Sequence, residues 1–231
     1  MKNTKDAKTL ILEALKTKAC LKQSIFKKTI EIFHLFKIEA EKLTFELKTE
    51  MNKIDKDISV DFIDKGDHEF HIIFGGDILV FYMHTNVFHF DKNHPIWNSS
   101  YVKEDELRTY CGMINVYNFL ADSFRYNRIN DIGYLVARFF VNNDLHYFVE
   151  GKRQLGFLYN DFINEVINNS KIRKIIESAI LYSMDFDLLT PNYDTMKEVS
   201  VNDITEATNA MSIKTGKRLG FKFHADNDNI E

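Results

Sequence analysis

Apolar residues recur at every seventh position along the first part of the chain. Residues 4–54 contain neither Gly nor Pro and are rich in Lys, Glu, Leu and Ala, which favour the helix. The positions of the repeat are Leu12, Ala19, Phe26, Phe33, Ala40, Leu47 and Ile54. This spacing predicts a helix with one coiled-coil-like apolar face. The companion face three residues further on is interrupted at Lys22, Thr29 and Glu50, which disfavours a simple two-stranded zipper.

The predicted helix is longer than a domain of this size. About fifty helical residues span ~75 Å at ~1.5 Å per residue. The helix therefore either projects and meets a partner, or breaks in two near residues 22–29, where polar residues thin the apolar face. We expect assembly as a homo-oligomer, in the simplest form a dimer. The expected interface comprises Leu12, Ala19, Phe26, Phe33, Ala40 and Leu47.

Between residues 57 and 90 the pattern changes, and apolar residues alternate with polar ones. Turn signals at Lys65-Gly66-Asp67, Gly75-Gly76-Asp77 and Thr85-Asn86 divide this region. Four strands are expected between them, at residues 58–62, 68–74, 78–83 and 87–90. No segment long enough for a crossover helix separates these strands, so the sheet is predicted to be an antiparallel meander.

Further strands are predicted after a loop at residues 91–109. Residues 110–120 fit a strand or a buried helix, and we favour the strand. Residues 132–141 and 145–150 flank Asn142-Asn143-Asp144, whose residues tolerate a positive φ and predict a hairpin. The total is about six or seven strands.

The helical period returns at residues 160–184, where Asn160 or Asp161 is the expected N-cap. A second helix is expected from Ser200 to Gly216, followed by a strand at residues 217–223. The predicted organisation is an α+β fold. Its parts are a helical assembly segment at residues 1–56, an α+β domain at 57–224 and a frayed tail at 225–231.

Composition excludes several classes of protein. The chain has 231 residues, 45% of them hydrophobic and 28% charged, which argues against a wholly disordered chain, a collagen-like repeat or a disulfide-rich miniprotein. Apolar runs are too short to cross a membrane. Cys20 and Cys111 form no CxxC motif, and the N-terminus lacks the features of a secretory signal. We therefore expect a cytoplasmic protein without a membrane partner.

Positive charge concentrates at the N-terminus, where residues 1–28 hold eight Lys and two acidic residues. Such an arm can contact phosphates, or it can be the solvated side of an amphipathic helix. No aromatic residues alternate with these lysines to stack on bases, and arginine is scarce in the chain. Nucleic-acid binding through this arm is therefore an alternative that we do not favour.

One short motif has a catalytic counterpart. Glu150-Gly151-Lys152 at the end of a predicted strand, with Asp131 upstream, resembles the pattern of the PD-(D/E)xK nucleases. The resemblance implies that Asp131 and Glu150 hold a divalent metal and that Lys152 stabilises the charge of the attacking water. Asn130 stands where that motif has Pro. The predicted hairpin also pairs Asp131 with residues near 155, about 16 Å along the strand from Glu150.

No other pattern predicts a catalytic, metal or cofactor site. Five histidines fall between residues 68 and 94, but their spacing does not converge three or four ligands, so we predict neither a metal nor a cofactor. Aromatic residues on the strands, among them Phe81, Tyr82, Phe88 and Phe90, serve a core or an aromatic ligand pocket. The favoured function is a non-catalytic protein that binds a partner or ligand and assembles through its N-terminal helix. A metal-dependent nuclease is the alternative.

Overall fold

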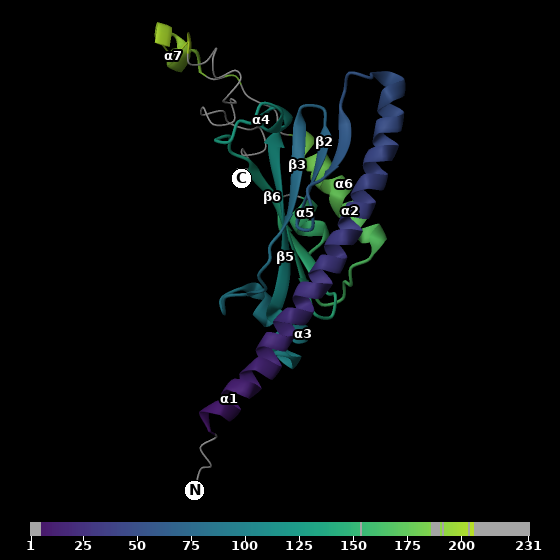
Figure 1. Ribbon diagram of the computed structural model, residues 1–231, viewed down its shortest axis with the longest axis vertical. Coiled ribbons are helices and arrows are strands. Elements are labelled where there is room, and N and C mark those ends of the chain that lie inside the picture. Colours follow the sequence, from purple (N-terminus) through teal and green to yellow (C-terminus); the bar gives the residue numbers. More distant parts are fainter. Residues whose placement is uncertain (1–5, 153, 186–189, 191, 203, 206–231) are drawn as a thin grey trace.

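The computed structural model describes residues 6–152, 154–185, 190, 192–202 and 204–205. Its longest feature is the N-terminal helix, which runs without a break from α1 (Ala7–Ala14) through the π-helical turn η1 (Leu15–Ala19) into α2 (Cys20–Ile54) (Figure 1). The long helix predicted from the absence of Gly and Pro is thus confirmed, with no break near residues 22–29. The helix ends where Asp55 takes an extended conformation, with φ −152°.

One antiparallel sheet of seven strands follows the helix. The chain order is β1 (Val60–Asp64), β2 (Glu69–Phe74), β3 (Asp77–Met83), β4 (Phe88–His89), β5 (Tyr110–Leu120), β6 (Tyr134–Asn142) and β7 (Tyr147–Gly151). The strands pair in the order β1-β2-β3-β5-β6-β7, and the short β4 also pairs with β5. The α+β fold with a meander sheet is confirmed, and β5 settles the ambiguous segment as a strand.

Tight turns allow the meander. Gly66 and Gly75 have φ of 103° and 59° in the first two hairpins, a conformation that favours glycine. In the β6–β7 hairpin the residue with positive φ is Leu145, at 64°, rather than one of the Asn or Asp residues before it. Asn142 stabilises this turn, since its Oδ1 accepts from the backbone N–H groups of Asp144 and His146.

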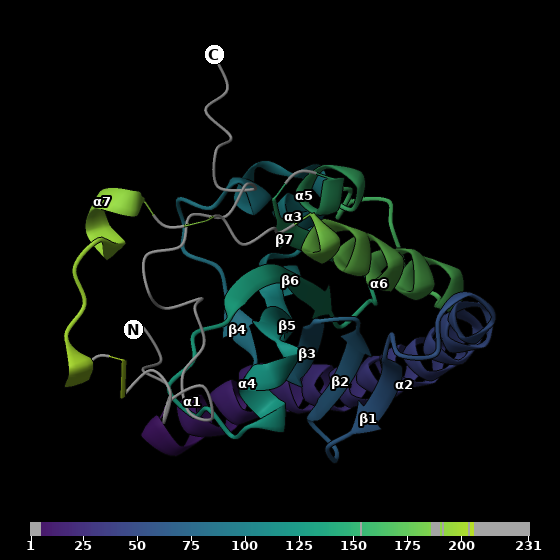
Figure 2. The same cartoon turned by 90° about the horizontal axis from the view of Figure 1, so that it is seen from above.

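The main core lies between one face of the sheet and two helices. α2 packs along this face, and α6 (Asn169–Met184) lies beside the C-terminal half of α2 (Figures 1 and 2). Phe33, Phe36 and Ala40 of α2 are fully buried there, and the Phe70 and Phe81 rings of neighbouring strands stack with 4.5 Å between their centroids. The helix and the sheet therefore share one core across the predicted boundary at residue 56.

A second apolar cluster covers one end of the opposite face. Two short helices supply part of it: η2 (Pro95–Asn98) and α3 (Ser100–Glu104), which a further short helix, η3 (Glu106–Thr109), follows in the chain. Buried members include Ile96, Val102, Cys111, Phe140 and Phe148. Burial raises the pKa of the Cys111 thiol.

The predicted helix at residues 160–184 is wrong at its start. The helix begins at Asn169, and the side chain of Asn168 caps it by accepting from the N–H of Lys171 at 3.0 Å. A shorter helix, α5 (Gln154–Leu158), comes before it. Phe162 packs into the second cluster instead, and residue 166 forms an isolated bridge with His146. Of the other short helices, α4 (Ala121–Arg125) follows β5, and α7 (Tyr193–Met196) lies near the end of the described residues.

Several predicted elements lie wholly or partly outside the described residues. Residues 201, 202, 204 and 205 are helical, in line with the helix predicted to begin near Ser200. Its continuation to Gly216, the strand at 217–223 and the tail at 225–231 are not among the described residues.

Candidate functional site

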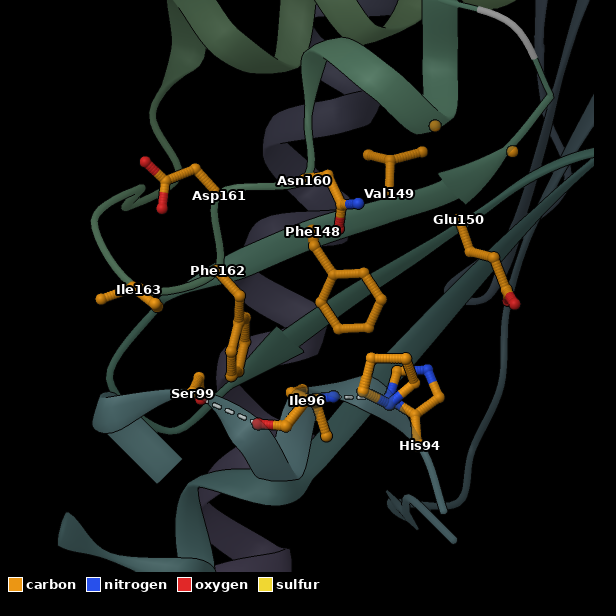
Figure 3. Close-up of a pocket in the computed structure, with 13 residues that line it drawn as sticks. His94, Ile96, Ser99, Phe148, Val149, Glu150, Asn160, Asp161, Phe162 and Ile163 are labelled. Carbon is orange, nitrogen blue, oxygen red and sulfur yellow. Dashed lines mark hydrogen bonds between the residues drawn. The ribbon is translucent and has the colours of Figure 1, made fainter. Parts of the chain in front are cut away.

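A pocket of about 450 Å³ opens between β7, α5 and the turn that contains η2 (Figure 3). Three segments that are distant in the sequence build it: residues 94–99, 148–151 and 156–163. Antiparallel pairing of β6 with β7 and packing of η2 on the same face bring them together. Its volume lies within the range of ~300–1,000 Å³ typical of small-molecule sites.

Aromatic rings form the walls of this pocket. Phe148 and Phe162 meet edge to face with 5.4 Å between ring centroids, and the His94 ring lies 6.2 Å from Phe148. Behind them, Phe140 stacks on Phe148 at 5.0 Å. These walls suit a flat apolar or aromatic group, in the manner of paired aromatic side chains.

A few polar groups lie among the rings. His94 Nδ1 accepts from the N–H of Ile96 at 3.2 Å, which in the neutral ring leaves Nε2 as the N–H donor. Ser99 donates to the carbonyl oxygen of Ile96 at 2.8 Å and is thereby held in place. The Asn160 amide is directed into the pocket, whereas the Asp161 carboxylate points away from it (Figure 3). The set offers hydrogen bonds for orienting a ligand.

Two glycines hold α5 close to the end of β7. A Cβ on Gly156 would lie 2.2 Å from the carbonyl oxygen of Gly151, and one on Gly151 would lie 3.0 Å from Cβ of Leu155. These distances leave no room for a side chain at Gly156. The two glycines, which both line the pocket, therefore allow α5 to lie against the end of β7.

A row of polar residues crosses the sheet next to the second cluster. Glu69, Tyr82, Asn115, Arg138 and Glu150 are successive cross-strand partners on β2, β3, β5, β6 and β7. At its end, Arg138 Nε donates to Glu150 Oε2 at 2.6 Å. Glu150, the residue of the ExK motif, is thus in an ion pair with the strand beside it.

The structure does not bring the three nuclease candidates together. Glu150 lies opposite Arg138, whereas Asp131 precedes the start of β6 and accepts a hydrogen bond from Ser123 Oγ at 2.7 Å. Asp131 lies seven positions before Arg138, which corresponds to at most roughly 23 Å of extended chain. Lys152 follows β7 on the same side as Glu150, at the edge of a second, shallow pocket.

The clustered histidines make separate contacts. His71 Nε2 lies 2.6 Å from Glu69 Oε1, and burial lowers the pKa of His71 against the opposing effect of Glu69. His84 Nδ1 accepts from the N–H of Asn86 at 3.0 Å, and the His89 ring packs against Tyr110 at 4.6 Å. Among the described residues no three His, Cys, Asp or Glu side chains are placed to share a metal ion.

The predicted interface residues divide into two groups. Phe33 and Ala40 are fully buried against the chain's own sheet, and Phe26 packs at the edge of that core. Leu12, Ala19 and Leu47 are exposed. Since an Asp at Phe33 would place a charge in the core, only the exposed group can report on assembly.

The start of the helix extends beyond the sheet (Figure 1). Across residues 7–19 no side chain is buried by the described part of the chain. Leu10, Ile11, Leu12 and Leu15 are between 47% and 60% exposed. Further along the basic arm, Lys28 Nζ donates to the carbonyl oxygen of Asn143, and Lys22 lies over the Tyr110 ring. Two lysines of the arm therefore contact the chain itself.

Sequence reasoning missed the pocket around Phe148. Phe148, Phe162 and His94 carry no common motif, and the signal that places them together is the pairing of β6 with β7. No helix in the described part of the chain is long and apolar enough to span a bilayer.

Comparisons with protein-family models, curated proteins and solved structures gave no match to this chain.

Proposed function

We propose that the protein is a non-catalytic cytosolic module that assembles with a second copy through α1 and η1. The observation that carries this proposal is the projecting start of the helix, which no other part of the described chain covers. Its four large aliphatic side chains are about half exposed, although the same helix buries Phe33 and Phe36 completely further along. Burying such side chains contributes ~1.5–3 kcal/mol each, so a partner helix or groove gains substantially by covering them.

The continuity of the helix supports the same proposal. An isolated helix of thirteen residues is marginal in water, but α1 and η1 extend a helix that the sheet already holds. The ordering cost of this segment is thereby reduced before it binds. Preorganisation of this kind strengthens association without adding contacts.

Other observations favour binding over the nuclease alternative. Glu150 is paired with Arg138, whereas Asp131 precedes β6 and is bonded to Ser123. The two free cysteines, one exposed and one buried, suit a reducing compartment such as the cytosol. The aromatic pocket near Phe148 would then serve ligand binding rather than a reaction.

Light scattering of the purified chain at tens of micromolar tests the proposal. We expect a dimer for the unmodified chain and a monomer for the double variant Leu12→Asp with Leu15→Asp, because two carboxylates on the apolar side of α1 oppose burial. The matched control is Thr9→Asp with Thr17→Asp, which adds the same charge on the polar side and should remain dimeric. A monomeric unmodified chain would contradict the proposal.

A further inference from the structure

A second apolar surface that the described residues leave uncovered lies at the far end of the same helix. We call it the α2–α6 groove; it has a volume of about 710 Å³ between the C-terminal half of α2, the start of β1 and α6. Its walls are aliphatic and include Leu47, Met51, Ile54, Ile58, Leu181 and Met184. Leu181 and Met184 are 63% and 61% exposed. Exposed apolar surfaces of this kind mark sites of interaction.

The rim of the groove is acidic. Glu46, Glu50 and Glu177 lie along it, and two cations are paired with them: Arg173, which also lines the groove, and Lys53, whose Nζ donates to Glu50 Oε1 at 2.6 Å. Three carboxylates and two cations leave the rim with a net charge of −1. Arg173 is held between carboxylates: its guanidinium donates to Glu46 at 2.9 Å and to Glu177 at 2.9 Å. The rim therefore favours a partner that carries positive charge beside its apolar side.

The projecting start of the helix has these properties. Residues 1–19 contain five lysines and two acidic residues. Ile11 and Leu12 each lie about one turn before Leu15, so the three form an apolar stripe on the side of the helix opposite Thr9, Glu13 and Thr17. Residues 7–19 span roughly 18 Å, close to the roughly 16 Å from Leu43 to Ile54 along the groove.

The chain cannot place its own α1 in this groove. Leu12 and Met51 belong to one continuous helix and are separated by about 58 Å at ~1.5 Å per residue. When the long helices of two copies lie side by side and antiparallel, the α1 of each copy lies beside the groove of the other. A closed dimer of this kind covers both surfaces at once.

We infer that the α2–α6 groove of one copy receives the α1–η1 segment of a second copy, the acidic rim facing the lysines. The inference rests on the proposed function, since it names the surface to which the projecting helix binds. The resulting interface is isologous: the apolar helix of each copy meets the apolar groove of the other.

Complementation between two defective variants tests this inference. The helix variant is Leu12→Asp with Leu15→Asp, and the groove variant is Leu181→Glu with Met184→Glu. Light scattering at tens of micromolar should find each variant monomeric. Their equimolar mixture should contain a 1:1 complex, because one intact helix and one intact groove remain in it.

The control variant is Ile38→Glu with Phe45→Glu. It replaces two exposed apolar residues of α2 that do not line the groove, and it should assemble as the unmodified chain does. Thermal unfolding checks the fold of every variant; should the double groove variant melt early, Leu181→Glu alone takes its place.

The outcomes separate the inference from the proposed function. A monomeric helix variant together with a groove variant that still dimerises means that α1 binds elsewhere, which overturns the inference and leaves the proposed function intact. Two monomeric variants whose mixture stays monomeric also overturn the inference, since that result indicates pairing of like surfaces. An unmodified chain that is monomeric overturns both.

Discussion

Lys37 is a cation on the buried side of α2. Its ammonium donates to Asp64 Oδ1 at 2.6 Å and to the carbonyl oxygen of Gly66 at 2.5 Å, and it lies 5.6 Å from the centroid of the Phe33 ring. Burial of a charge is tolerated only when its hydrogen bonds are satisfied. The positive φ of Gly66 turns the β1–β2 connection so that it supplies one of these acceptors. Through these two hydrogen bonds, Lys37 therefore holds the β1–β2 hairpin against α2.

The partner of Lys37 gives the stability a defined pH dependence. The hydrogen bond from Lys37 lowers the pKa of Asp64 below its usual value of 3.8. A carboxyl with a depressed pKa stabilises the fold above its unfolded-state pKa, and this contribution is lost as the pH falls through the folded-state pKa. We expect Asp64→Asn to lower the free energy of unfolding at pH 7 by at most about 1 kcal/mol, because the carboxylate is largely exposed.

Urea unfolding at pH 7 and at pH values below 4 measures this effect. The difference between Asp64→Asn and the unmodified chain should shrink as the pH falls. Asp67→Asn removes the same charge from the same turn without a contact to Lys37, and should differ little from the unmodified chain at either pH. A difference for Asp64→Asn that is independent of pH would contradict the argument.

At the scale of elements, α2 and β5 approach unusually closely. A Cβ on Gly112 would lie 1.9 Å from Oγ1 of Thr29, and Thr29 is held in place because its hydroxyl donates to the carbonyl oxygen of Ile25 at 2.7 Å. The Thr29 side chain fills the space that a side chain on residue 112 would need. The absence of a side chain at Gly112 therefore sets how near the helix lies to the centre of the sheet.

Gly112→Ala should separate these two elements and destabilise the chain by about 1–3 kcal/mol, the usual cost of an extra methyl group in a packed core. Urea unfolding with an unchanged m-value measures the loss. Gly76→Ala is the control, because a Cβ there meets nothing within 4 Å. Adding Thr29→Ala to Gly112→Ala removes the closest atom and should restore part of the stability; no recovery would mean that the cost arises elsewhere.

The strands were predictable from the sequence because alternation and turn residues are local signals. Gly66 and Gly75 mark two hairpins, and both have the positive φ that such turns need. The start of α6 was not predictable in the same way. Phe162 has the spacing of a helical apolar face, but its ring contributes to the pocket beside Phe148. Tertiary packing, which the periodicity of the sequence does not reveal, determines the conformation of the segment before α6. Asn168 rather than Asn160 therefore caps the helix.

At the scale of the whole molecule, the seven-residue repeat identifies a buried stripe without identifying what buries it. Phe33 and Ala40 are covered by the chain's own sheet, while Leu12 is not covered by the described residues. The candidate pocket could not be predicted from the sequence either, because its three segments meet only after the strands pair. The sequence thus predicted the elements and the fold class, but not the surfaces that their packing creates.

Assembly should make the stability of the whole molecule depend on its concentration. A partner at 100 times its Kd stabilises the folded state by about 2.7 kcal/mol, and 1 kcal/mol shifts the Tm of a chain of this size by about 2–4 °C. We expect the Tm to rise by several degrees between ~1 and ~100 μM in scanning calorimetry. The double variant Leu12→Asp with Leu15→Asp should show no such rise, and a Tm of the unmodified chain that is independent of concentration would argue against assembly.

The π-helical turn at Leu15–Ala19 lies between α1, which we propose for assembly, and α2, which packs on the sheet. A π turn closes its hydrogen bonds over five residues instead of four, which takes up about one extra residue. One residue corresponds to about 100° of rotation about the helix axis. Positions seven apart on either side of the turn are therefore out of angular phase, and α1 faces a different direction from the seam of α2. A single-residue insertion or deletion at this turn would rotate α1 about the helix axis and leave the packing of Phe33 and Phe36 unchanged. The surface that we propose for assembly can therefore vary in evolution independently of the core.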